Sequence, residues 1–246
     1  MRNIKITIEY DGSAYCGWQR QSRGISIQQT IEEALCKITQ EDIKIVASGR
    51  TDAGVHAVAQ VANFRCNTTL NVKNLFGGLN SSLPNDIAVT TVQEVDLSFH
   101  SRRDTKSKIY LYQITNTKHR HALFRAYSWQ IFGELNVKAM QTATEFLLGE
   151  HDFRSFCSTR TDVQDFVRNV MALDIEQDEE QKMISITVEA NGFLRHMVRT
   201  IVGTLAKVGR GKIEPEEIVK ILIAKDRTVA GNTAPPHGLF LKEVKY

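Results

Sequence analysis

Nearly the same order of predicted strands and helices occurs in both halves of this sequence. This order restricts the possible folds more than any other feature. In the first half, Ile4, Ile6 and Ile8 alternate with polar residues, which predicts a half-buried strand. The capping pattern of Ser26 and Gln29 precedes a run with helical periodicity. The predicted elements are a strand around 4–8, a helix over 27–38, strands at 43–48 and 57–66, a helix over 72–83 and a strand at 87–95.

The second half follows nearly the same order. The predicted elements are strands at 107–115, 166–176 and 182–190, helices after Asn136, over 193–208 and from Pro215, a strand at 238–244 and a short strand near 125–131. Gly149 is the expected C-cap of the helix that follows Asn136. Tyr110 and Tyr112 are expected on one face of their strand, and Ile109 and Leu111 on the other.

A β-α-β-β-α-β order is typical of ferredoxin-like units. We therefore expect an α+β protein with two ferredoxin-like or RRM-like α/β halves, residues 1–104 and 105–246. Their strands are expected to form one large mixed, mainly antiparallel sheet with a central active-site cleft. No repeat at the residue level supports a duplication, so this prediction rests on element order alone.

The charge of the chain is unevenly distributed. Of its 246 residues, 31 are Lys or Arg and 28 are Asp or Glu, which gives a net charge of +3. Residues 1–104 are neutral overall, so the excess lies in residues 105–246. Basic residues are concentrated at 102–125, and residues 195–212 include no acidic residue. This pattern favours a positive patch for a polyanion, although an ordinary solvated surface remains the simpler interpretation.

Several classes of protein do not fit the sequence. The four cysteines lack any CxxC spacing, which argues against a zinc ribbon and is typical of reduced cytosolic thiols. No apolar stretch is long enough to span a bilayer, and the N-terminus has no signal-peptide pattern. The motifs for binding nucleoside triphosphates or dinucleotides are missing, as are those of serine hydrolases and zinc proteases. His119 and His121 are too close together in a cationic stretch for a convincing metal site.

The segment at 48–57 is the first candidate for chemistry. Its glycines allow a tight turn after a strand, and that turn would hold Arg50 and Asp52 at a fixed angle. An Asp between small residues is accessible to a ligand, but Asp52 also suits a plain turn in which it caps backbone amides. An aspartic protease is disfavoured because its Asp precedes Thr or Ser and Gly, whereas Ala53 follows Asp52 here.

Two further segments are candidates for binding. Arg195 and Arg199 are expected on one face at the start of a helix, where an anion is favoured, but both also suit an exposed surface. Tyr110 lies in the middle of a predicted strand. An aromatic residue there usually packs on the sheet, yet it can also stack on an unpaired base.

These segments together resemble the tRNA pseudouridine synthase A family over almost the whole chain. The matching residues are 10–12 (Tyr-Asp-Gly), 17–21 (Gly-Trp-Gln-Arg-Gln), 49–56 (Gly-Arg-Thr-Asp-Ala-Gly-Val-His), 83–87 (Leu-Pro-Asn-Asp-Ile), 110–112 (Tyr-Leu-Tyr), 149–153 (Gly-Glu-His-Asp-Phe), 168–170 (Arg-Asn-Val), 193–199 (Phe-Leu-Arg-His-Met-Val-Arg) and 234–239 (Ala-Pro-Pro-His-Gly-Leu). The run at 49–56 is the most specific of them. Cys16 and Ile109 depart from residues that are frequent in the family and put some RNA contacts in doubt.

The resemblance implies that the chain converts uridine to pseudouridine at positions 38, 39 and 40 of the tRNA anticodon stem-loop. It implies a cytoplasmic homodimer that needs no metal or organic cofactor. Asp52 matches the family's nucleophile, Arg195 matches the residue expected to pair with it, and Tyr110 matches the aromatic residue that stacks on the target base and assists removal of the C5 proton.

The uridine must leave its helix, and Arg50 is our candidate for holding the flipped state. The further residues expected to bind the RNA are Arg199, Arg20, Gln19, Arg102 and Arg103. Two alternatives stay open. One is an RNA-binding module without catalysis, and the other is an enzyme that uses Asp52 on a free nucleotide.

Overall fold

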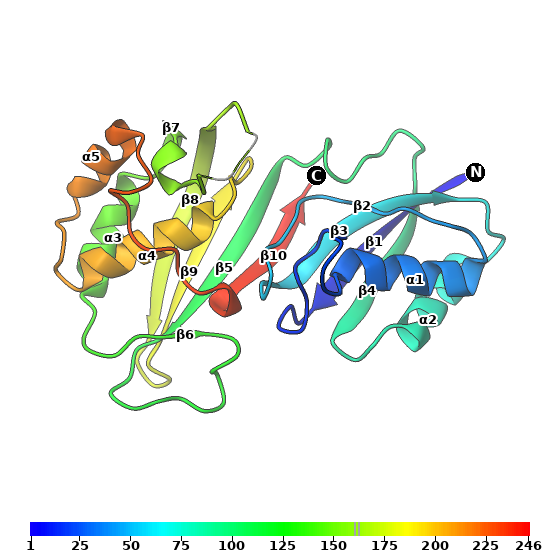
Figure 1. The fold of residues 1–246 in the computed structure, drawn as a ribbon, viewed down its shortest axis with the longest axis horizontal. Coiled ribbons are helices and arrows are strands. Elements are labelled where there is room, and N and C mark those ends of the chain that lie inside the picture. The colour runs from blue at the N-terminus through cyan, green and yellow to red at the C-terminus, as the bar shows by residue number, and fades with distance from the viewer. Residues whose placement is uncertain (160, 162) are drawn as a thin grey trace. The chain divides into compact units, whose positions relative to one another are not determined.

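The computed structural model describes residues 1–159, 161 and 163–246 and divides into two compact units (Figure 1). Unit 1 comprises residues 1–106 and 240–246, and unit 2 comprises residues 107–239. Almost all of the last strand thus groups with unit 1, whereas the expected halves were 1–104 and 105–246. The physical reason is its pairing, because Phe240 and Leu241 run parallel to His56 and Ala57 of unit 1.

Unit 1 has two helices and five strands of a ten-stranded sheet. Its elements are β1 (Arg2–Tyr10), α1 (Ile27–Thr39), β2 (Val46–Ala47), β3 (His56–Cys66), α2 (Val72–Ser82), β4 (Ile87–Val95) and β10 (Leu239–Lys245). The strand order is β4-β1-β3-β10, with β2 paired to β3. The alternating side chains of Ile4, Ile6 and Ile8 are fully buried, and α1 and α2 lie side by side (Figure 1). The period-two pattern of β1 therefore supplies part of the core of this unit.

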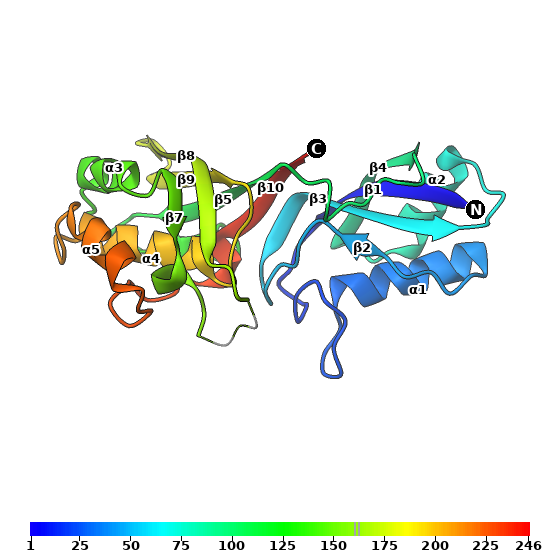
Figure 2. The ribbon, with the colours of Figure 1, turned by 90° about the horizontal axis from the view of Figure 1, so that it is seen from above.

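The described residues of unit 2 form three α-helices, two 3-10 helices and the remaining strands of the ten-stranded sheet. Its elements are β5 (Ser107–Thr115), β6 (Trp129–Gln130), α3 (Val137–Glu145), β7 (Gly149–Asp152), a short 3-10 helix (Arg154–Phe156), β8 (Val167–Asp178), β9 (Met183–Ala190), α4 (Met197–Gly209), α5 (Glu217–Ala224) and a second 3-10 helix (Pro236–Gly238). The strands follow the order β5-β9-β8-β7, all antiparallel, with β6 paired to β5. Helix α4 lies across one face of this sheet (Figure 2).

The expected fold class is confirmed, since both units are α/β with mainly antiparallel strands. The start of α1 is close to the prediction: the backbone N–H of Gln29 donates to Ser26 Oγ at 3.2 Å. The Gln29 side chain donates instead to Glu33 at 2.8 Å. Of the two hydrogen bonds of a capping box, the one from the Gln29 backbone to Ser26 is therefore formed. Asn71 and Asn136 cap α2 and α3 in the same way.

Three predicted element boundaries are wrong. The strand expected at 43–48 is reduced to β2. Helix α4 begins at Met197 rather than Phe193, because His196 has a left-handed backbone (φ 64°) that ends any helical continuation toward the N-terminus. Gly149 begins β7 and is not the C-cap of α3, a position held by Phe146.

Candidate active site

Asp52 lies in a turn between β2 and β3, as the glycine pattern predicts. The backbone N–H of Val55 donates to the Asp52 carbonyl at 3.1 Å, and Gly54 has a φ of 75° that a side chain would disfavour. Asp52 is half-buried and the neighbouring Arg50 is exposed. The chain therefore presents a carboxylate and a guanidinium from one tight turn.

The last residue of β1 and the segment that follows it hold this turn in place through Thr51. The Trp18 N–H donates to the Thr51 carbonyl at 3.0 Å, and the hydroxyls of Tyr10 and Thr51 lie 2.8 Å apart. Gly17 approaches so closely that a Cβ atom there would lie 2.7 Å from the Thr51 oxygen. Burial raises the pKa of Tyr10 to about 12, so this phenol stays neutral beside the turn. The residue before Asp52 is thus fixed by both its backbone and its side chain.

Gln60 holds the other end of the turn. The Ser48 hydroxyl donates to Gln60 Oε1 at 2.7 Å, and Gln60 Nε2 donates to the Gly49 carbonyl at 3.0 Å. Gln60 is fully buried on β3. A turn tied at both ends loses little further entropy when a ligand binds, which favours a preorganised site.

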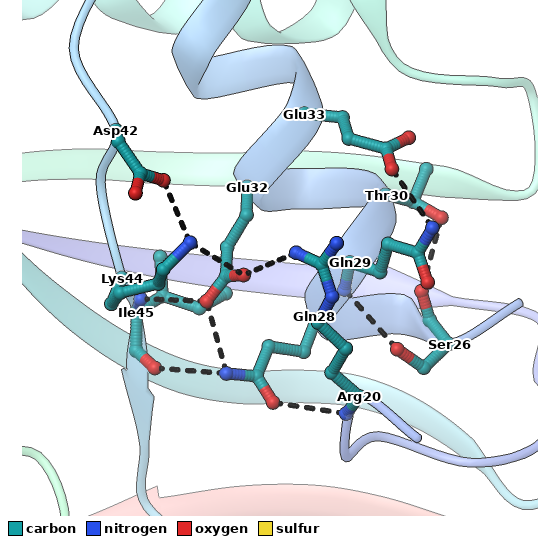
Figure 3. A network of polar contacts seen from close by, with 10 residues as sticks. All are labelled: Arg20, Ser26, Gln28, Gln29, Thr30, Glu32, Glu33, Asp42, Lys44 and Ile45. Atoms are coloured by element: carbon teal, nitrogen blue, oxygen red, sulfur yellow. Dashed lines mark hydrogen bonds and ion pairs between the residues drawn. The ribbon is translucent and has the colours of Figure 1, made fainter. Parts of the chain in front are cut away.

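Arg20 is part of a polar network centred on Glu32 of α1 (Figure 3). Its Nη1 lies 3.4 Å from Glu32 Oε2, and its backbone N–H donates to Gln28 Oε1 at 3.1 Å. Glu32 also accepts from Gln28 Nε2 at 3.0 Å and from the Ile45 N–H at 3.2 Å. Its side chain is only 3% exposed, whereas that of Arg20 is 49% exposed. The network anchors the backbone of the loop while half of the Arg20 side chain still reaches solvent.

Tyr110 and Arg195 belong to unit 2. The Tyr110 ring, on β5, is 7% exposed and meets the edge of the Phe193 ring, with centroids 5.0 Å apart. Phe193 stands two residues before Arg195, whose side chain is exposed and whose carbonyl accepts from the Ser158 N–H at 2.9 Å. One side of the Tyr110 ring is therefore packed by the segment that carries Arg195.

Arg195 and Arg199 do not share a helical face, which corrects the expectation. Arg195 precedes α4, separated from it by the left-handed His196, whereas Arg199 lies within the helix. The Arg199 Nε donates to the Ala234 carbonyl at 2.7 Å. This contact ties α4 to the segment near the C-terminus of unit 2 and gives Arg199 a role in packing.

Arg102 and Arg103 lie in the turn that precedes β5. Both side chains are exposed, and both backbone N–H groups donate to His100 Nδ1, at 3.2 Å and 3.3 Å. Gln19 is half-buried in the loop after β1. The turn at 101–104 therefore presents two adjacent cations from a backbone that His100 holds in place.

Glu32 and Phe193 stand out only in the structure. Glu32 occupies a helix position where a charge usually faces water, so no sequence signal distinguishes it. Phe193 is part of the matched run at 193–199 and lies two residues before Arg195. This closeness in sequence was the available signal for its contact with Tyr110.

Other kinds of site find little support in the described part of the chain. Its four cysteines are free thiols. Residues 1–159, 161 and 163–246 include no group of three or more His, Cys, Asp and Glu side chains placed to hold a metal ion. Over the same residues, no helix has both the length and the apolar character needed to cross a membrane.

Comparison with known proteins gives a consistent picture. A family described as tRNA pseudouridine synthase matches residues 6–104 and 143–246. Proteins named tRNA pseudouridine synthase A from Thermoanaerobacter sp. (strain X514) and Geotalea daltonii are 45% and 46% identical, and one named tRNA pseudouridine synthase A 2 from Clostridium perfringens is 47% identical. Each comparison covers 246 residues, all of this chain and all of the relative. A solved H/ACA RNP with a substrate RNA is far more distant, with 15% identity, a TM-score of 0.36 and coverage of 82% of this chain and 44% of that one.

Proposed function

Because this chain belongs to the tRNA pseudouridine synthase family, we propose that it isomerises uridine to pseudouridine at positions 38, 39 and 40 of the tRNA anticodon stem-loop. The observation that carries the proposal is the turn at 49–56, which holds Asp52 between two anchored ends. A carboxylate on a preorganised turn suits covalent catalysis better than binding alone, since RNA is itself an anion.

The isomerisation breaks the bond between N1 of uracil and C1′ of the ribose and forms a bond between C5 and C1′. The base must turn while it is detached, the C5 proton must leave, and N1 must gain a proton. Asp52 is the nucleophile of this scheme and attacks either the ribose or the base. The rigid turn keeps its carboxylate in position while the base moves.

The other site residues assist these steps. Tyr110 stacks on the uracil, and its hydroxyl assists removal of the C5 proton. The edge contact with Phe193 supports this role, because it holds the Tyr110 ring in one orientation. Arg195 pairs with the Asp52 carboxylate, and Arg50 holds the flipped nucleotide outside its helix. The exposed position of Arg50 beside Asp52 supports that role.

The RNA backbone requires cations beyond the reacting nucleotide. We assign phosphate or sugar contacts to Arg20, Gln19, Arg102, Arg103 and Arg199. The half-exposed side chain of Arg20 and the exposed pair Arg102 and Arg103 suit such contacts. Arg199 is the weakest of the set, because its Nε already bonds to Ala234. The enzyme works without a metal or organic cofactor, as a homodimer in the cytoplasm.

Replacing the nucleophile tests the proposal most directly. Asp52→Asn should abolish tritium release from tRNA labelled at C5 of uridine, because an amide is a far weaker nucleophile, while tRNA binding persists. Asp42→Asn is the matched control, since Asp42 is an 83% exposed carboxylate in the same unit and pairs only with surface Lys44 in the contacts observed. Turnover by Asp52→Asn at the wild-type rate would reject the assignment.

The two alternatives make different predictions in the same assay. A binding module without catalysis would bind tRNA and release no tritium in its wild-type form. An enzyme acting on free nucleotides would convert UMP or uridine as readily as tRNA. Mapping of the modified positions in the product then checks the assignment to positions 38, 39 and 40.

A further inference from the structure

Unit 2 contains a pocket of about 320 Å³ that the proposed function does not use. It lies at the loop between β5 and α3, and His237 of the second 3-10 helix also lines it. Five lining residues from the loop carry charge, an imidazole or an aromatic ring: Arg120, His121, Arg125, Trp129 and Phe132. The volume is within the range of small-ligand sites.

The walls of the pocket are held by hydrogen bonds of the loop itself. Gln130 Nε2 donates to the Thr115 carbonyl at 3.2 Å, and Gln130 Oε1 accepts from the His121 N–H at 3.2 Å. The hydroxyls of Ser128 and Thr115 also bond to each other. The Trp129 ring meets the edge of the buried Tyr112 ring, with centroids 6.4 Å apart. These contacts connect the loop to β5, so the pocket is formed before any ligand binds.

The chemistry of the lining favours an anion with an aromatic group. Arg120 and Arg125 are exposed, and the described residues around the pocket include no acidic side chain. The Phe132 side chain is 60% exposed, and Trp129 is half-buried. Two arginines suit a phosphate, and an exposed phenyl ring together with a half-buried indole in the same pocket suits a planar base.

His121 lines the pocket with a half-buried ring that packs against Phe124, with ring centroids 4.8 Å apart. Its Nδ1 has almost no exposed surface, so this nitrogen faces the protein rather than the pocket.

We propose that this pocket binds one unpaired nucleotide of the tRNA, distinct from the target uridine. Its phosphate lies against Arg120 and Arg125, and its base lies against Phe132 and Trp129. The identification of the nucleotide as part of tRNA rests on the proposed function, whereas the affinity of the pocket for a nucleotide does not. A nucleotide at this site adds affinity for RNA and acts through the substrate's position rather than through the chemical step.

A short RNA without uridine separates this pocket from the active site. We would titrate the wild-type protein with single-stranded penta-adenylate and follow tryptophan fluorescence, with Trp129→Phe used to identify the contribution of the pocket. Trp18, the other tryptophan, is 2% exposed in unit 1. Penta-adenylate should quench the wild-type signal, and Trp129→Phe should lose most of that quenching.

Two lining variants and one control locate the binding. Phe132→Ala should weaken penta-adenylate binding by about fivefold or more, the lower end of what one stacked base contributes. Arg120→Gln should weaken it and lower the salt dependence by about one phosphate contact. Lys118→Gln is the control, because Lys118 is an exposed cation of the same loop that does not line the pocket. It should bind like the wild type.

The binding results test the pocket independently of the proposed catalytic function. The proposal that this pocket binds a nucleotide would be overturned by an absence of quenching. It would also be overturned if Phe132→Ala, Arg120→Gln and the wild type bound penta-adenylate with equal affinity. Equal weakening in Lys118→Gln would also overturn it, since binding would then depend on charge alone. Tritium release from labelled tRNA by the wild-type protein tests the proposed function separately. A rise in the KM for tRNA in Phe132→Ala would show that the nucleotide comes from the substrate.

Discussion

Glu32 shows how much one side chain contributes to the local structure around the loop that carries Arg20. Its carboxylate is almost inaccessible to water, yet Gln28 and the Ile45 N–H donate to it, and Arg20 and Lys44 lie within ion-pair distance (Figure 3). Both cations are about half-exposed or more, so their charges remain solvated. The buried hydrogen bonds, rather than the ion pairs, therefore carry most of the stabilisation.

Removing this carboxylate should destabilise the protein. We expect Glu32→Ala to lower the free energy of unfolding by about 2 kcal/mol, because the buried Ile45 N–H would lose its acceptor. Glu33→Ala is the matched control, since Glu33 is the exposed neighbour on the same helix, and it should change stability by less than about 0.5 kcal/mol. Urea unfolding of both variants is the measurement, and equal effects would show that the network contributes nothing specific.

At the scale of elements, the contact between α4 and the segment at 230–234 leaves no room for side chains. A Cβ atom on Gly203 would lie 1.7 Å from the Asn232 carbonyl oxygen, and one on Gly231 would lie 2.5 Å from the Gly203 carbonyl carbon. The Gly231 N–H also donates to the buried Thr204 hydroxyl at 2.9 Å. Glycine is needed on both sides because two backbones meet there directly.

Two glycine substitutions should therefore have opposite effects. Gly203→Ala should lower the free energy of unfolding by about 3 kcal/mol or more, because the backbone at 230–234 must move away. Gly77→Ala, on α2, should raise it by about 0.5–1 kcal/mol, since no atom lies within 4 Å of the new methyl group and alanine favours the helix. Urea midpoints of the two variants are the test. A stabilising Gly203→Ala would contradict this close packing.

Element positions were predictable where periodicity decides them. The strands at 87–95 and 107–115 agree with β4 and β5 because their alternating burial follows the sequence. The start of α4 was not predictable, since residues 193–196 keep helical spacing while His196 adopts a left-handed backbone. Strand β7 was missed because its pairing partner, β8, lies about 20 residues away and its four residues show no clear alternation.

At the scale of the whole molecule, buried phenols limit stability at high pH. Burial raises the pKa of Tyr10 and of Tyr246 to about 12, and it raises that of Tyr112 further. A phenol with a raised pKa in the folded state stabilises the protein fully below its unfolded pKa of about 10. That contribution is lost as the pH rises toward the folded pKa, because the unfolded chain ionises first.

The free energy of unfolding should therefore fall between about pH 10 and pH 12. Tyr10→Phe should reduce the steepness of this fall, because one of the groups that ionises on unfolding is removed. Urea midpoints at intervals from pH 9 to pH 12 provide the measurement. A decline of the same steepness in Tyr10→Phe would show that Tyr10 contributes none of it.

Charge distribution across the molecule predicts how RNA binding depends on salt. The double variant Arg102→Gln/Arg103→Gln should weaken tRNA binding and reduce the slope of log affinity against log salt by roughly two, one for each phosphate that is no longer neutralised. Lys182→Gln is the control, since Lys182 is exposed in an acidic turn and pairs with Glu179. Filter binding from 50 to 300 mM salt would measure both, and an unchanged slope in the double variant would place the RNA elsewhere.

The amino-acid sequence was sufficient to predict the fold class, most of the elements and the residues proposed for catalysis. Period-two and helical patterns are local properties, and the run at 49–56 is contiguous, so both can be read without knowledge of the rest of the chain. These patterns marked Asp52, Arg50 and Tyr110 as candidates, and the resemblance to the tRNA pseudouridine synthase A family then supplied the roles of Asp52 and Tyr110.

What holds these residues, and what lies around them, became visible only in the folded molecule. The contacts of Tyr10 and Trp18 with Thr51, the burial of Glu32 and the meeting of Gly203 with Gly231 join residues far apart in the sequence. The pocket beside Trp129 likewise combines the loop after β5 with His237, about 100 residues later. Such features depend on packing between elements, and packing is not encoded in any local pattern of residues.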